Sequence, residues 1–185
     1  MPRPFTDRAE IDMYRSLNTF AEFLARFLAL AGGAVLLAIT ALTCVSIIGR
    51  VLLPLGLGLG PIRGIYDITE IGMAAAVFAF LPWAQYREAH ARVDLFQWAI
   101  PQKADQLLDL VFNAAMAFVA AVGTYRLYLG MQDKLSYGET TLIAQIPVWQ
   151  GYAAGLVGAV GFVIIAVFCT LRAARRLAGY ADPPV

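Results

Sequence analysis

The chain alternates between long apolar stretches and short polar ones, and this pattern predicts four membrane-spanning helices. The stretch 27–48 contains no charged residue, and its 22 residues would extend about 33 Å as an α-helix, enough for a hydrocarbon core roughly 30 Å thick. Further apolar stretches follow at about 65–86, 104–129 and 148–171. We therefore predict an all-α membrane protein that forms a single membrane domain over residues 1–185.

The basic residues are divided unequally between the two sides of the membrane. Ten of the 14 Lys and Arg residues lie before the first span, between the second and third, or after the fourth. Cytoplasmic loops carry the excess of Lys and Arg, so both termini are predicted to be cytoplasmic. The ten are Arg3, Arg8, Arg15, Arg26, Arg87, Arg92, Lys103, Arg172, Arg175 and Arg176, and the other four are Arg50, Arg63, Arg126 and Lys134.

Two further segments are amphipathic without spanning. Within 1–26, Leu17, Phe20 and Leu24 recur at helical spacing. This indicates a cytoplasmic amphipathic helix that either lies on the inner membrane surface or extends the first span. Within 90–100, apolar residues alternate with charged ones. That pattern predicts a short interfacial helix, with an ordinary cytosolic loop as the alternative.

The composition excludes several classes of protein. Hydrophobic residues make up 60% of the chain and charged residues 15%, well below the roughly 25% charged residues of soluble domains. The net charge of +1 and the lack of a basic run argue against nucleic-acid binding. His90 is the single histidine, so a bis-histidine haem or a Cys/His zinc site is not expected. We predict no catalytic, substrate-binding or metal-binding residue, no cofactor and no enzymatic activity.

Ionisable residues inside the predicted spans are the remaining candidates, because charge in hydrocarbon is costly. Asp67 and Glu70 are three residues apart and share a helix face near the outer end of the second span. Arg126 lies at comparable depth in the third span, and Arg50 closes the first. We favour a salt bridge of Glu70 with Arg126 or Arg50 that fixes helices, or one to another subunit, over a proton or cation site.

Polar and small residues predict helix-packing faces in the third and fourth spans. Asp109 and Asn113 are four residues apart on the third, and such polar pairs join neighbouring helices in membranes. The fourth contains a GxxxG pattern at Gly151 and Gly155. This pattern indicates close packing, with a helix of this chain and a helix of another chain as equal alternatives.

Several local patterns, taken in order, resemble one family. Gly49 and Arg50 close the first span, and Glu70 comes early in the second. Residues 87–95 read REAHARVDL, and 146–149 read IPVW before the last span. With four short spans over nearly the whole chain, the sequence resembles the small membrane subunit, of the DctQ type, of TRAP (tripartite ATP-independent periplasmic) transporters.

The resemblance implies a role without catalysis. Such a subunit would sit in the bacterial inner membrane and brace a large permease subunit that carries the substrate and sodium sites. A periplasmic binding protein would deliver the substrate, usually an organic acid. The loop after the second span, with His90, Arg92, Asp94 and Trp98, would dock to a partner or to membrane lipid. The alternative is a small homo-oligomeric exporter that uses Glu70 for proton coupling.

Overall fold

The computed structural model describes residues 8–55, 60–88 and 102–179. Its regular elements are helices, apart from one isolated bridge between Thr140 and Pro147. Four of these helices are long and apolar enough to cross a membrane, which confirms the predicted all-helical class with four membrane-length helices. They are α1 (Arg8–Leu52), α2 (Ile65–Tyr86), α3 (Gln102–Tyr137) and α4 (Val148–Leu177), with a short 3-10 helix, η1 (Leu53–Leu55), after α1.

Two helices continue well beyond the apolar stretches. α1 is a single helix of 45 residues, so the described part of segment 1–26 extends the first span. α3 continues eight residues beyond position 129, because no residue there stops a helix before Gly138, whose φ is 62°. Such a backbone conformation is easy for glycine and strained for other residues. The interfacial helix predicted within 90–100 lies outside the described residues.

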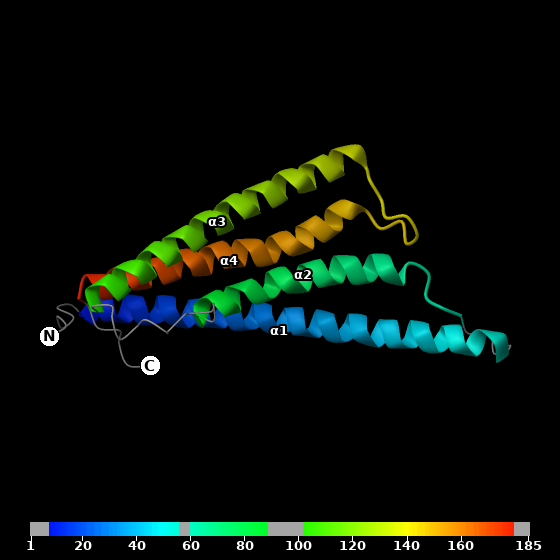
Figure 1. The fold of residues 1–185 in the computed structure, drawn as a ribbon, viewed down its shortest axis with the longest axis horizontal. Coiled ribbons are helices and arrows are strands. Elements are labelled where there is room, and N and C mark those ends of the chain that lie inside the picture. Colours follow the sequence, from blue (N-terminus) through cyan, green and yellow to red (C-terminus); the bar gives the residue numbers. More distant parts are fainter. Residues whose placement is uncertain (1–7, 56–59, 89–101, 180–185) are drawn as a thin grey trace.

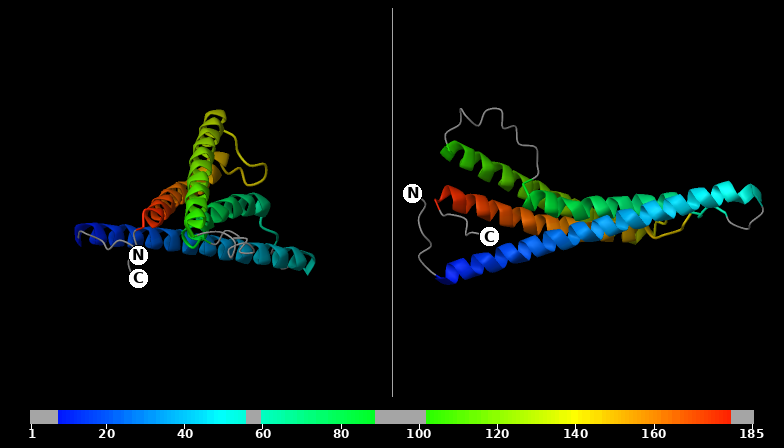
Figure 2. Two further views of the ribbon diagram at one scale, coloured as in Figure 1. Left: turned by 60° about the vertical axis from the view of Figure 1, so that its left-hand side comes forward. Right: turned by 90° about the horizontal axis from the view of Figure 1, so that it is seen from below.

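The helices lie side by side in the order α3, α4, α2, α1 when the molecule is viewed down its shortest axis (Figure 1). α1 begins and α4 ends at the same end of the bundle, which we call the terminal end. The opposite end, where chain segments join α1 to α2 and α3 to α4, is the hairpin end. In this view the helices diverge toward the hairpin end (Figure 1), whereas the view from below shows them crossing and spreading toward the terminal end (Figure 2, right).

α4 is the central helix, and its glycines allow the close packing. In the most apolar 18-residue stretch of α4, 44% of the residues are buried within the chain, against 6% in α3. A Cβ atom on Gly158 would lie 2.5 Å from the carbonyl carbon of Phe78, and one on Gly155 would lie 3.2 Å from the Phe78 ring. The GxxxG pattern of α4 therefore packs against α2 of this chain.

α1 and α4 also meet, close to the terminal end. Small side chains of α1, Ala21 and Ala25, form a buried cluster with Ile165, Phe168 and Cys169 of α4. Toward the hairpin end α1 and α4 separate. The bundle is thus closed at one end by direct α1–α4 packing and open at the other.

Candidate functional site

The terminal end contains a cluster of polar and aromatic side chains that joins α1 to α2. The hydroxyl of Tyr86, at the end of α2, lies 3.3 Å from Oδ1 of Asn18 and 3.5 Å from Oε2 of Glu22, both on α1. The Tyr86 ring stacks on Phe168 of α4, with the centroids 6.5 Å apart. One side chain therefore contacts two neighbouring helices at once.

An ion-pair group joins α2 to α4 at the same end. Glu88 follows α2 directly, and its Oε1 accepts hydrogen bonds from Nη2 of Arg172 at 2.6 Å and from Nη1 of Arg176 at 3.3 Å. Arg172 Nη2 also donates to the backbone oxygen of Tyr86 at 3.3 Å. The two arginines are four residues apart and so share one face of α4.

Aromatic rings support the arginines of this cluster. The guanidinium carbon of Arg175 lies 4.7 Å from the ring centroid of Tyr14, and that of Arg172 lies 5.6 Å from that of Tyr86. Both distances are within the range of cation–π attraction. Since Tyr14 belongs to α1, the Arg175–Tyr14 contact joins α4 to α1, and the Arg172–Tyr86 contact joins α4 to α2. We call Tyr14, Asn18, Tyr86, Glu88, Arg172, Arg175 and Arg176 the terminal-end cluster.

A buried amide pair joins α2 to α3. Gln85 is 2% exposed, and its Nε2 donates a 3.0 Å hydrogen bond to Oδ1 of Asn113. Asn113 Nδ2 in turn donates to the backbone oxygen of Asp109 at 2.8 Å. Asn113 of the predicted polar pair thus joins α3 to Gln85 of α2, and the bond to Asp109 is made by the backbone oxygen of Asp109.

Asp67 bonds to a loop and not to a cation. Its Oδ2 accepts hydrogen bonds from the backbone N–H groups of Ile143 at 3.1 Å and Ala144 at 2.8 Å. These residues belong to the connection between α3 and α4, which is further closed by a bond from Val148 N to Glu139 O at 3.0 Å. Asp67 therefore attaches α2 to this connection at the hairpin end.

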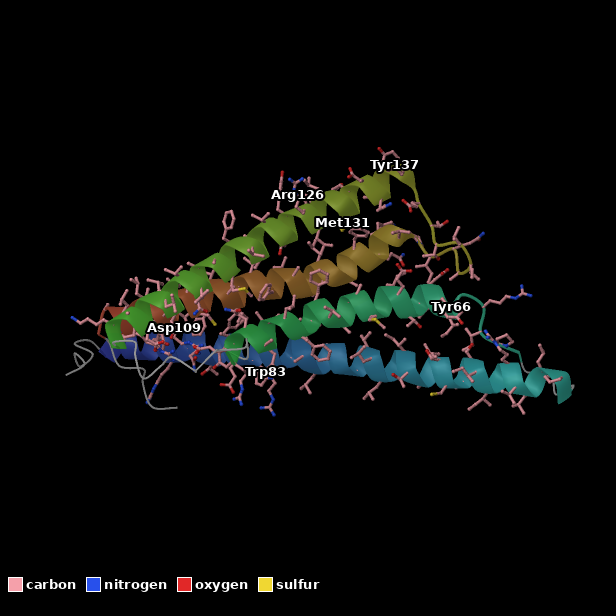
Figure 3. The ribbon with its side chains drawn as sticks, in the orientation of Figure 1. Tyr66, Trp83, Asp109, Arg126, Met131 and Tyr137 are labelled. Atoms are coloured by element: carbon pink, nitrogen blue, oxygen red, sulfur yellow. The ribbon has the colours of Figure 1, made fainter. Side chains whose placement is uncertain are left out.

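Glu70, Arg50 and Arg126 are not brought together. All three are exposed, and none of them belongs to the ion pairs found among the described residues, which join Lys134 to Glu139 and Glu88 to Arg172 and Arg176. Arg126 is on α3, which α4 separates from α2, and its side chain points away from α4 (Figure 3). The loop residues His90, Arg92, Asp94 and Trp98 lie outside the described residues.

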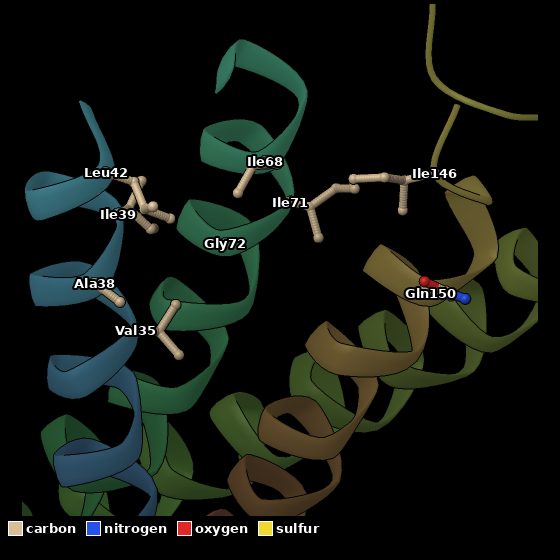
Figure 4. A pocket seen from close by; sticks show the side chains of 9 residues that line it. All are labelled: Val35, Ala38, Ile39, Leu42, Ile68, Ile71, Gly72, Ile146 and Gln150. Atoms are coloured by element: carbon tan, nitrogen blue, oxygen red, sulfur yellow. The ribbon is translucent and has the colours of Figure 1, made fainter. Parts of the chain in front are cut away.

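An apolar groove opens where α1 and α4 diverge, with α2 as its floor (Figure 4). Gln150 is the one polar side chain among the residues that line it, so the groove offers no charged group for catalysis or ion binding. The lining residues are Val35, Ala38, Ile39, Leu42, Ile68, Ile71, Gly72, Ile146 and Gln150.

Sequence reasoning missed most of the terminal-end cluster. In the sequence, Arg172 and Arg176 indicate only which side of the membrane is cytoplasmic, and Tyr86 only marks the end of the second span. A signal was present, because two arginines four residues apart at the end of one span could pair with Glu88 at the end of another. Gln85, inside an apolar stretch, likewise needed a polar partner, since a buried amide without one is costly.

These observations define a multi-pass membrane protein whose helices are joined by polar contacts. No group of three His, Cys, Asp or Glu side chains that could hold a metal ion occurs in the described part of the chain. The family model of the DctQ component of tripartite ATP-independent periplasmic transporters matches residues 39–179. The chain belongs to this family and is therefore the small membrane subunit of a TRAP transporter.

The family match also bears on the other predictions. A DctQ component is part of a transporter and is not an enzyme, and such components in general work with a large permease subunit and a periplasmic binding protein. The match does not support the alternative of a proton-coupled exporter. No curated protein and no solved structure matched the chain.

Proposed function

We propose that this subunit binds the large permease subunit and braces it during sodium-coupled, binding-protein-dependent uptake of an organic acid across the bacterial inner membrane. The observation that carries this proposal is the side-by-side order α3, α4, α2, α1 of the four helices, joined by side chains at the terminal end. This arrangement leaves helix faces without protein cover, and α3 in particular packs mainly on α4, with a hydrogen bond to α2 at the terminal end. Such faces suit lipid on one side and a larger membrane subunit on the other.

The terminal end is proposed to be cytoplasmic. Arg87, Arg172, Arg175 and Arg176 gather there, and the excess of Lys and Arg marks the cytoplasmic side. The connections at the hairpin end would then face the periplasm, on the side of the binding protein. The predicted docking role of the loop with His90 and Trp98 belongs to the cytoplasmic side and stays a proposal.

Co-purification tests the binding part of this proposal. Affinity purification of the tagged chain from its native membrane should yield a much larger hydrophobic protein in stoichiometric amount. Vesicles containing both subunits, sodium and the binding protein should take up an organic acid, whereas vesicles with either subunit alone should not. Recovery of a homodimer that transports alone would contradict the proposal.

The proposal that the subunit braces its partner is tested by measuring whether the subunit changes shape during transport. Spin labels at Leu17 on α1 and Leu135 on α3, in a chain with Cys44 and Cys169 replaced, report on the distance from the terminal end of α1 to the hairpin end of α3. A brace should keep this distance unchanged when sodium and substrate are added to the complete complex. A change in the distance distribution during transport would show that the subunit moves with its partner.

A further inference from the structure

Glu70 lies on the side of α2 that the rest of the chain leaves uncovered. Tyr66, Met73 and Val77 are more than half exposed, at 69%, 52% and 54%. With Glu70 they are spaced by three or four residues and therefore form one stripe along the helix. We call these four residues the α2 ridge.

The other sides of α2 are packed against its neighbours. Gly72 is covered by Ile39 of α1, and Ile71 lies against Gly151 of α4. Phe78 lies against Gly155 and Gly158. The α2 ridge is thus the side of the helix that remains for a contact outside this chain.

Glu70 is set within the apolar length of α2. The helix has 22 residues, about 33 Å at 1.5 Å per residue, so it barely exceeds a hydrocarbon core of roughly 30 Å. Glu70 is the sixth residue, about one and a half turns below the outer end. A carboxylate at this depth is costly against lipid and normally faces protein or water.

The described cations of this chain do not supply a partner. Lys134 is paired with Glu139, and Arg172 and Arg176 are paired with Glu88 at the opposite end. Arg126 points away from α4 on the far helix (Figure 3). Arg50 and Arg63 belong to none of the described ion pairs either, so the described part of this chain supplies no charge that balances Glu70.

We propose that the α2 ridge docks on a membrane-spanning helix of the large permease subunit, and that Glu70 forms an ion pair there with a Lys or Arg at matching depth. The inference rests on the proposed function, because it names the contact face for that partner. Tyr66, Met73 and Val77 supply the apolar packing on which helix association in lipid depends. Glu70 fixes the register, because a displaced helix would leave both charges unpaired.

The first test compares two Glu→Gln changes of the same size. Glu70→Gln should lower the yield of co-purified large subunit by roughly three- to tenfold, the range of polar contacts between membrane helices. The control, Glu139→Gln, removes a carboxylate in the loop after α3 and should leave the yield unchanged. Unfolding of the chain expressed alone should be the same for wild type and Glu70→Gln, because Glu70 has no ion partner among the described residues.

Three results would overturn the inference. One is a normal complex yield in Glu70→Gln while wild type co-purifies, which would leave the proposed function intact. Another is a lower unfolding free energy of the isolated Glu70→Gln chain, large enough to account for the lost complex. This result would assign Glu70 to contacts within this chain. If wild type itself recovers no large subunit, the proposed function fails first and the inference fails with it.

Charge reversal identifies the partner residue. Glu70→Lys should abolish the complex, and suppressors that restore it should replace a Lys or Arg of the large subunit by Asp or Glu. Suppressors confined to Arg50 or Arg126 of this chain would contradict the inference.

A photo-crosslinking side chain at Met73 should react with the large subunit in the native membrane, and reaction with lipid alone would overturn the proposal.

Discussion

The two ends of the bundle are held together in different ways. At the terminal end, side chains on or just after one helix bond to side chains of another, as in Tyr86 with Asn18 and Glu88 with Arg172. At the hairpin end, side chains bond to the backbone of connecting segments, as in Asp67 with Ala144 and Ser46 with the N–H of Ile62. The first kind joins helices directly, and the second attaches the connections to them.

This difference suits a subunit that must be rigid and still offer surface to a partner. The terminal-end cluster joins α1, α2 and α4 by contacts within this chain. Toward the hairpin end the helices diverge, and apolar surface and Glu70 remain uncovered. The comparison therefore predicts that changes at the terminal end damage the isolated chain, whereas changes on the α2 ridge damage the complex.

The largest effect is expected where α2 and α4 approach most closely, between the two ends. Gly158→Leu would place a branched side chain where even a Cβ atom is 2.5 Å from the Phe78 carbonyl carbon. Overpacking costs typically 1–3 kcal/mol and more against rigid backbone, so we expect a loss of about 3 kcal/mol in unfolding free energy in mixed micelles. The control is Gly123→Ala in α3, where no atom lies within 4 Å of the added Cβ. Equal stability of the two variants would refute this close approach.

A smaller effect is expected at the terminal-end cluster. Glu88→Gln removes the charge that Arg172 and Arg176 share, and the Arg172 side chain is 12% exposed. Hydrogen bonds to charged groups are worth about 1.5–3 kcal/mol. We expect a loss of about 2 kcal/mol in the isolated chain, measured by the same unfolding assay. Arg172→Lys alone should cause a smaller loss than Glu88→Gln, because the charge is kept although the planar fork of donors is lost. A loss seen only in the presence of the large subunit would assign the cluster to the interface.

The sequence predicted the elements better than their contacts. Hydropathy placed the second span at 65–86, the same bounds as α2. For α1 it left open whether the segment before residue 27 extends the first span, which it does, and for α3 it predicted too short a helix. Apolar content shows which residues suit lipid, whereas a helix ends only where its backbone is interrupted. The pair of Asp109 and Asn113 was visible because both residues lie on one helix.

Contacts between helices could not be predicted in the same way. Glu88 and Arg172 are 84 residues apart, and their meeting depends on α2 and α4 being neighbours. The pattern along the chain does not state which helices are adjacent. For the same reason Asp67 and Glu70 were grouped by their spacing, although Asp67 turns to the loop between α3 and α4 and Glu70 remains on the exposed side.

A weaker connection at the terminal end is the amide pair between α2 and α3. A double-mutant cycle of Gln85→Ala and Asn113→Ala should give a coupling of about 1 kcal/mol, since hydrogen bonds between membrane helices average about 0.6 and reach about 1.7 kcal/mol. Reversible unfolding of the wild type, both single variants and the double variant gives this value. A coupling of zero would mean that α3 is held by its packing on α4 alone.

The smallest effect is expected from Asp67 at the hairpin end. Asp67→Asn keeps the size of the side chain but replaces a charged acceptor by a neutral amide, and hydrogen bonds to a charged group are stronger than those to a neutral one. The N–H groups of Ile143 and Ala144 should therefore exchange with solvent faster, as measured by hydrogen–deuterium exchange of the loop between α3 and α4, while the global stability stays nearly unchanged. Asp133→Asn is the matched control, because its carboxylate is not among the described hydrogen-bond acceptors of this loop. If the whole bundle unfolded more easily in Asp67→Asn, the hairpin end would be part of the structural core, and the contrast between the two ends would not hold.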